Sequence, residues 1–227
     1  CKVVYKESLR DSYIKALLKE IDMVGSNLGT DKKEVTSLYF GGGTPALVTD
    51  DIKRIIKQIN RYFIITEGIG IELHPCDVNE EKLAILKDAG VTKVSIGIQS
   101  FQEEYLSILG RNKIDYQSMF NALDKVKFET VSMDFIFALP NQTIEVLRND
   151  IEIAFNNGAN HIAIYPFIDF TFTDRKFNKM TNRDKKKLLY KIVAYCKEKG
   201  YVRSSIWTFS KYGASKYSSM TRENFLG

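Results

Sequence analysis

The sequence is poor in the residues on which disulfide-linked and zinc-dependent proteins rely. Its 227 residues include only 3 Cys, 4 Pro and 2 His, and no cysteine pair has zinc-site spacing. A disulfide scaffold and a structural zinc site are therefore not indicated. No apolar run reaches the roughly 20 residues that a membrane-spanning helix requires, and the first residues lack a signal-peptide pattern. The scattered cysteines favour a reducing compartment, so we expect a cytoplasmic protein.

An excess of one charge is also lacking. Lys and Arg number 33 against 28 Asp and Glu, a formal charge of +5, while hydrophobic residues make up 44%. This composition excludes disordered and collagen-like chains. The positive residues are spread along the chain, which supports an anionic partner weakly and nucleic acid not at all. The sequence opens on Cys1 and closes on Gly227 without a terminating pattern, so we expect a piece of a longer protein.

Apolar runs and amphipathic stretches alternate along the chain. A helix is expected near 11–23, followed by strands at 35–40, 69–73, 93–98, 131–137, 161–165 and 202–207. Helices are predicted at 50–63, at 80–89 after Asn79 as N-cap, twice across 102–127, at 144–156 and at 182–199. A strand about every 30 residues is typical of βαβ units, so we predict an α/β fold with a parallel sheet in a single domain, residues 1–227. The pattern does not decide between an open sheet and a partial barrel.

Polar residues occur at the ends of four successive predicted strands, where parallel sheets place functional groups. The first strand ends in Gly41, Gly42 and Gly43, with Thr44 and Pro45 next. Three glycines let a ligand approach bare backbone amides, although a tight turn would also explain them. The other three polar groups, each of which could be purely structural, are Glu72, Gln99 and Asp134. Together they suit a zwitterionic ligand that carries hydroxyls.

Arg111 follows the third of these strands and could clamp a carboxylate, or could be a solvated surface arginine. Other catalytic templates are missing, since the sequence has neither H-E-x-x-H nor G-x-S-x-G. Cys196 has apolar neighbours at helical spacing and is expected in the core, while Cys76 follows Pro75 in a loop.

Four motifs resemble a known family. They are Tyr39-Phe40-Gly41-Gly42-Gly43-Thr44-Pro45, Ile71-Glu72-Leu73-His74-Pro75, Gly97-Ile98-Gln99-Ser100-Phe101, and the segment 133–143 from Met133 to Thr143. In this order and spacing the series resembles the radical S-adenosylmethionine enzymes of the oxygen-independent coproporphyrinogen III oxidase group. The resemblance covers about residues 10–170 and thins beyond them.

The resemblance implies a partial (β/α)6 TIM-like barrel whose first strand and C-terminal part are missing, with the core match in residues 1–170 and 171–227 beginning the C-terminal region. It also implies a [4Fe–4S] cluster and S-adenosylmethionine, whose reductive cleavage releases a 5′-deoxyadenosyl radical. The residues expected to contact S-adenosylmethionine are Gly42, Gly43, Thr44, Glu72, Gln99, Arg111, Asp134 and the backbone around Ile168. The family's oxidases decarboxylate propionates of a tetrapyrrole, with a reductant such as flavodoxin or ferredoxin.

The main departure from the family is that the C-x-x-x-C-x-x-C cluster motif is missing. Cys1 could be its last cysteine, but one thiolate cannot hold the cluster, so we expect this chain alone neither to assemble it nor to turn over. Two further functions stay open within the family, namely a heme chaperone and a heme-opening enzyme. A third alternative is that the chain is an unrelated barrel enzyme whose glycine loop binds phosphate.

Overall fold

The computed structural model describes residues 6–168, 180–215 and 217. Its main sheet has seven strands in the order β2-β4-β5-β6-β7-β9-β8, and a separate small sheet pairs β1 with β3. The strands are β1 (Lys33–Val35), β2 (Leu38–Phe40), β3 (Phe63–Ile65), β4 (Ile69–Leu73), β5 (Lys93–Gln99), β6 (Thr130–Phe137), β7 (His161–Pro166), β8 (Val202–Arg203) and β9 (Thr208–Ser210). The helices are α1 (Glu7–Ser26), α2 (Thr49–Ile59), α3 (Glu80–Asp88), α4 (Glu103–Ile108), α5 (Tyr116–Lys125), α6 (Ile144–Asn156) and α7 (Asn182–Glu198), with 3-10 turns at Pro45–Val48 and Pro75–Asp77.

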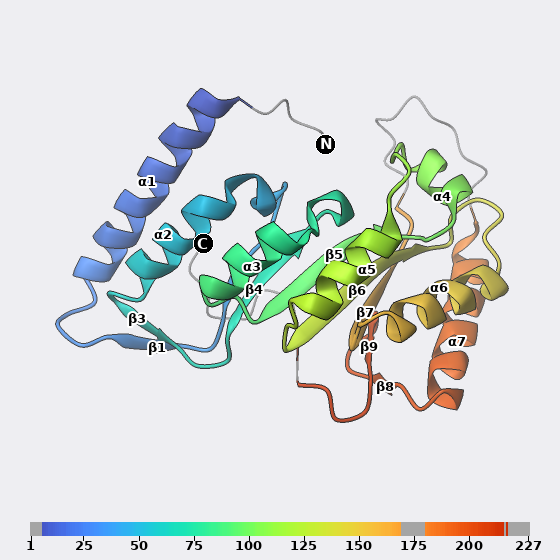
Figure 1. The fold of residues 1–227 in the computed structure, drawn as a ribbon. Helices are drawn as coiled ribbons and strands as arrows, with labels where there is room; N and C mark the ends of the chain where they lie inside the picture. The colour runs from blue at the N-terminus through green and yellow to red at the C-terminus, as the bar shows by residue number, and fades with distance from the viewer. Residues whose placement is uncertain (1–5, 169–179, 216, 218–227) are drawn as a thin grey trace.

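The two faces of the main sheet differ in chemistry. Helices α2, α3, α5, α6 and α7 cover one face (Figure 1), where strand residues such as Ile71, Ile96 and Met133 are fully buried in a single apolar cluster. Alternate residues point to the other face, and across β4, β5, β6 and β7 one row of register partners there reads Glu72, Ser95, Ser132 and His161. This second face, which we call the inner face, is polar, and no described helix packs on it.

The predicted parallel α/β arrangement is confirmed for five strands. Strands β2, β4, β5, β6 and β7 are parallel neighbours, so their carboxyl ends share one edge of the sheet. The α6 helix matches its predicted range, and Asn79 caps α3 by accepting a hydrogen bond from the Lys82 N–H at 2.9 Å. Periodicity and capping residues specify these elements locally, which explains why they were predictable.

Three predictions were wrong. The expected strand at 35–40 is two strands in different sheets, because β1 pairs with β3 whereas β2 pairs with β4. The helix expected to reach residue 63 ends at Ile59, and Phe63 begins β3. The expected sixth parallel strand at 202–207 is instead the antiparallel pair β8 and β9, with β9 antiparallel to β7. Arg203 donates to the carbonyls of Ser205 and Ile206 at 3.0 and 2.9 Å, which holds the turn that reverses the chain.

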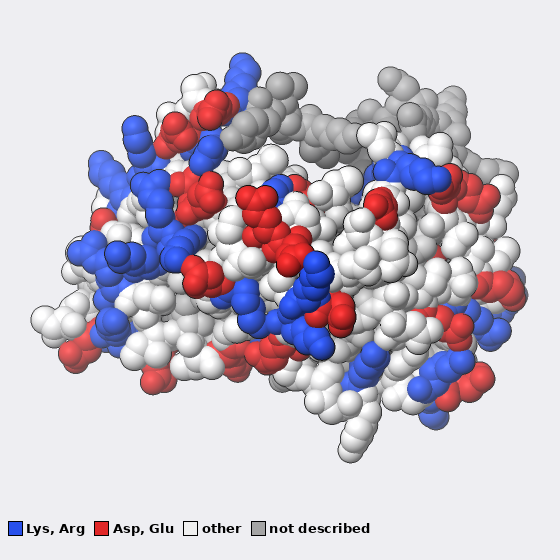
Figure 2. All heavy atoms as spheres, in the orientation of Figure 1, with Lys and Arg blue, Asp and Glu red and all other residues white. Residues whose placement is uncertain are grey.

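On the face of the molecule that the helices cover, Lys and Arg alternate with Asp and Glu (Figure 2). The Lys and Arg side chains are most frequent over α1 and α2. This distribution agrees with the small and scattered charge excess in the sequence. Among the described residues, no helix is long and apolar enough to cross a membrane.

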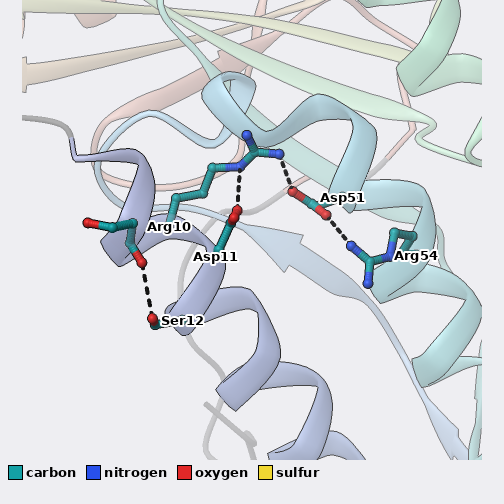
Figure 3. A network of polar contacts seen from close by, with 6 residues as sticks. Arg10, Asp11, Ser12, Asp51 and Arg54 are labelled. Atoms are coloured by element: carbon teal, nitrogen blue, oxygen red, sulfur yellow. Dashed lines mark hydrogen bonds and ion pairs between the residues drawn. The ribbon is translucent and has the colours of Figure 1, made fainter.

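Helix α1 docks on α2 through a buried carboxylate. Asp51, which is only 5% exposed, accepts hydrogen bonds from Arg10 on α1 and Arg54 on α2, each at 2.7 Å (Figure 3). These bonds hold the pKa of the Asp51 carboxyl below its usual value, and the bond from Arg10 has the largest effect. Burial of the carboxyl acts in the opposite direction. At the other end of α1, a Cβ on Gly25 would lie 2.2 Å from the Tyr62 ring, so glycine allows the close approach.

Replacing Asp51 with alanine is expected to lower the free energy of unfolding by about 2 kcal/mol, because two charge-assisted hydrogen bonds across the helix pair are lost. Since the pKa is lowered in the fold, the contribution is present above the unfolded-state pKa and is lost as the pH falls through the folded-state pKa. Urea titration at pH 7 measures the loss. Asp50→Ala, at the exposed neighbouring carboxylate, is the matched control, and equal losses in the two variants would contradict the interpretation.

Candidate functional site

The glycine loop lies at the carboxyl end of β2. Gly42 and Gly43 have φ of +78° and +63°, a conformation that favours glycine, and no heavy atom lies within 4 Å of where their Cβ atoms would be. The loop bends over the neighbouring strand β4, since the Gly42 N–H donates to Glu72 Oε2 at 3.1 Å. An exposed strip of backbone therefore lies beside a carboxylate.

Glu72 is partly buried on the inner face, with a donor at each oxygen. Besides the Gly42 amide on Oε2, the Tyr39 hydroxyl donates to Oε1 at 3.3 Å. Burial is the main reason that the pKa of Tyr39 lies well above its usual value, so the phenol keeps its proton and acts as a donor. Tyr39 comes from β2, opposite Gly70, where the missing side chain leaves room for the ring.

Asp134 on β6 is the second inner-face carboxylate. It accepts hydrogen bonds from the hydroxyls of Ser95 at 2.8 Å and Ser132 at 3.2 Å. Burial raises the pKa of Asp134 to about 6; the two hydroxyls lower it, and the charge of Glu72 raises it further. Ser95 is the register partner of both Glu72 and Ser132, so the two carboxylates face the same part of the inner face from strands on either side of β5.

Gln99 and Arg111 meet over Gly97 at the end of β5. Gln99 Nε2 lies 2.9 Å, and Arg111 Nη2 3.8 Å, from the position that a Cβ on Gly97 would take. Arg111 Nη1 also donates to the Gly97 carbonyl at 2.7 Å. Burial lowers the pKa of Arg111, yet a guanidinium stays charged in proteins. Arg111 is therefore partly buried and turned back toward β5, unlike a freely solvated surface arginine.

The structure adds Tyr217 and its neighbours to this site, and these residues were not predicted from the sequence. The Tyr217 hydroxyl donates to the Tyr39 hydroxyl at 3.3 Å, and its ring meets that of His161 edge-on at 5.7 Å. Burial raises the pKa of Tyr217 to about 12 and lowers that of His161, so both side chains are neutral at pH 7. Ser215 contacts Thr130 at 3.2 Å between the two hydroxyl oxygens. No local signal in the sequence links residues 215 and 217 to β2, β6 and β7.

The remaining expected residues lie along the same edge or outside the described part. Thr44 follows the glycine loop, and its carbonyl accepts from the Leu47 N–H at 3.1 Å. Ile168, 63% exposed, follows β7, where the Phe167 N–H donates to the Phe137 carbonyl at 2.7 Å. Cys1 lies outside the described residues. Within the described residues, no three His, Cys, Asp or Glu side chains form a group that could hold a metal ion.

The structure thus brings together most of the residues expected at the site. Glu72 accepts from the Gly42 N–H and raises the pKa of Asp134, while Gln99 and Arg111 both lie near Gly97 on β5, the strand between β4 and β6. Such an arrangement offers backbone N–H groups, two carboxylates, an amide and a cation at one sheet edge. A ligand carrying an ammonium, a carboxylate and hydroxyls is chemically complementary to it.

The chain resembles several characterised proteins. The heme chaperone HemW of Bacillus subtilis is 32% identical over 164 residues, which is 70% of this chain and 43% of that protein. The oxygen-independent coproporphyrinogen III oxidase of Synechocystis sp. is 28% identical over 214 residues, 88% of this chain and 45% of that one. The structure of the coproporphyrinogen III oxidase HemN from Escherichia coli matches with a TM-score of 0.79 at 21% identity, over 93% of this chain and 51% of that chain. The chain therefore spans about half the length of these relatives.

The HemN match confirms the expected α/β partial barrel. The family model described as the Radical SAM superfamily matches residues 5–154, which include all four motifs that carried the resemblance. S-adenosylmethionine with a [4Fe–4S] cluster, the cofactor pair expected from the sequence, is the pair that this superfamily uses. This chain belongs to the Radical SAM superfamily.

Proposed function

We propose that this chain is the S-adenosylmethionine-binding part of an oxidoreductase that acts on a tetrapyrrole, as the oxygen-independent coproporphyrinogen III oxidases do. The observation that carries the proposal is the convergence of the glycine loop, the Glu72 and Asp134 carboxylates and the Gln99–Arg111 pair at one sheet edge. The names of the relatives support the substrate class, since one is a coproporphyrinogen oxidase and another a heme chaperone.

The residues of this edge fit the cofactor group by group. Arg111 has one N–H on the Gly97 carbonyl and, among the described residues, no carboxylate partner, which suits it to a ligand carboxylate. Glu72 is placed to bind the ammonium, with the amides of Gly42 and Gly43 beside it and Thr44 at the loop's exit. Asp134 is placed for hydroxyls, and Gln99 and the backbone at Ile168 complete the edge. When bound, the cluster and S-adenosylmethionine supply a carbon-centred radical, with the electron coming from a reductant such as flavodoxin or ferredoxin.

The chain's own residues orient this ligand and limit water at its inner end. Tyr39 and Tyr217 join their hydroxyls beneath Glu72, and both phenols keep their protons because burial raises their pKa. A protonated pair there offers no base. Holding the reactants in line and shielding them from water is the protein's share of such chemistry.

Full-length protein with its reconstituted cluster tests the proposal. Incubated anaerobically with dithionite, S-adenosylmethionine and coproporphyrinogen III, it is expected to form vinyl product, which chromatography of the oxidised porphyrins detects. Glu72→Gln is expected to weaken S-adenosylmethionine binding at least tenfold, about 1.4 kcal/mol, because the ammonium loses a charged partner. Glu81→Gln, at an exposed glutamate on α3, is the matched control.

A heme chaperone is the second candidate, favoured by the 32% identity to the Bacillus subtilis protein. A chaperone would bind heme in a spectroscopic titration and leave coproporphyrinogen unconverted under the same conditions. That pair of results would replace the oxidase reading while leaving the cofactor site intact. Unchanged S-adenosylmethionine binding in Glu72→Gln would contradict the site itself.

A further inference from the structure

Asp150 is a buried carboxylate that the site described above does not use. It lies on α6, on the helical side of the sheet, and is only 1% exposed. Its carboxylate accepts hydrogen bonds from the Ser100 hydroxyl at 2.7 Å, the Phe101 N–H at 3.1 Å and Gln102 Nε2 at 3.4 Å. These donors come from three consecutive residues, and they form the turn that directly follows Gln99. One side chain from α6 therefore holds the whole turn at the end of β5.

The turn is conformationally demanding. Gln99 has φ of +71°, the left-handed region that non-glycine residues rarely adopt, and the pairing of β5 with β6 shifts register between Ile96 and Gln99. Such a backbone persists only where surrounding contacts over-determine it. Besides Asp150, the Tyr116 hydroxyl donates to the Ser100 carbonyl at 3.2 Å and the Gln102 N–H donates to Ser100 Oγ at 3.2 Å. Asp150 supplies the largest share of these contacts.

The same turn determines where the Gln99 side chain lies. Its Nε2 stands over Gly97, whose carbonyl accepts from Arg111 Nη1 at 2.7 Å. Arg111 depends on the backbone of β5, whereas Gln99 depends on its own backbone conformation and therefore on the turn. Loss of the turn's anchor would move the Gln99 amide away from the guanidinium while the rest of the site stayed in place.

We propose that Asp150 is a positioning residue for the cofactor, which acts through the 100–102 turn to keep the Gln99 amide beside Arg111. The inference rests on the proposed function, since it assigns Gln99 and Arg111 to S-adenosylmethionine. Only a carboxylate meets the requirement at this position, because it accepts from three donors at once and offers no donor of its own. The amide of an asparagine would direct an NH2 group at one of those three donors.

Asp150→Asn in the full-length protein with its cluster tests the inference. The dissociation constant for S-adenosylmethionine, measured by equilibrium dialysis, is expected to rise about tenfold. Hydrogen exchange at the Phe101 amide is expected to become faster than in the wild type. Ile151→Val and Ile162→Val, which thin the buried core, serve as controls matched for the loss of melting temperature, and they are expected to leave the dissociation constant unchanged.

Gln99→Ala separates failure of the inference from failure of the proposed function. Weaker binding in Gln99→Ala together with wild-type binding in Asp150→Asn would overturn the positioning role alone. Wild-type binding in Gln99→Ala would overturn the cofactor role of Gln99 and the inference with it. If Asp150→Asn does not fold, Ser100→Ala takes its place, because it removes one of the donors and is expected to weaken binding by a smaller factor. Wild-type binding in Ser100→Ala would then overturn the inference.

Discussion

Replacing Gly97 with alanine is expected to weaken S-adenosylmethionine binding at least tenfold while changing the free energy of unfolding by less than about 1 kcal/mol. The new methyl group would come within 2.9 Å of Gln99 Nε2 and 3.8 Å of Arg111 Nη2. The approach to Arg111 is ordinary van der Waals contact, whereas the Gln99 amide must give way, and as the far end of a flexible side chain it can move without disturbing the sheet. Displacement of the Gln99 amide removes one of the two groups near Gly97 that we assign to the cofactor. Equilibrium dialysis and urea titration on the same preparation measure the two effects.

Gly70→Ala is the matched control for this variant, on the neighbouring strand and the same inner face. There the added methyl would lie 2.7 and 3.0 Å from two ring carbons of Tyr39. That ring cannot move aside easily, because its hydroxyl bonds to both Glu72 and Tyr217. We therefore expect Gly70→Ala to lose stability as well as binding. Equal losses of stability in the two variants, or normal cofactor binding in Gly97→Ala, would contradict our account of Gly97.

Much of the fold and part of the site were predictable because their signals are local. Strand β6 and helix α6 follow from apolar periodicity, and Glu72 and Asp134 are recognisable as carboxylates within largely apolar strands. The break between β1 and β2 was not predictable in this way, since no glycine or proline separates Val35 from Leu38 and the two strands pair with different partners. Strand pairing depends on long-range contacts that periodicity does not record.

The missed parts of the site share this cause. Asp150 lies 50 residues from Ser100, and Tyr217 lies 178 residues from Tyr39, yet each pair is joined by a hydrogen bond. Asp150 lies in an amphipathic helix, and from the sequence alone an acidic residue in such a helix is expected on the solvent-exposed face. Only the packed structure shows that it points inward to a turn with three donors. Functional groups of parallel sheets lie at the carboxyl ends of the strands, and this rule was enough to predict the residues at the edge of the site. The residues that support them from behind, Asp150 and Tyr217, are identified only by the three-dimensional structure.

Asp134→Asn is expected to stabilise the protein at neutral pH. Burial raises the pKa of Asp134 to about 6, against 3.8 for the ordinary carboxyl, so the folded state binds its proton more tightly than the unfolded chain does. Stability from this group is therefore fully present below pH 3.8 and is lost as the pH rises through about 6. The shift corresponds to about 1 to 2 kcal/mol once partial solvent screening is allowed for, or a few degrees in melting temperature.

Melting temperatures of wild type and Asp134→Asn between pH 4 and 8 test this expectation, with Asp124→Asn at an exposed carboxylate as the control. The two curves should meet near pH 4 and diverge above pH 6, with the Asp134 variant the more stable and Asp124→Asn following the wild type. The asparagine keeps an acceptor and gains a donor for the Ser95 and Ser132 hydroxyls, so the strands stay joined, but it loses the charge that we assign to ligand hydroxyls. A buried carboxylate that weakens the fold at working pH is what a binding site retains for its ligand. A less stable Asp134→Asn at pH 7.5 with the wild-type pH slope would show instead that the carboxylate serves the fold.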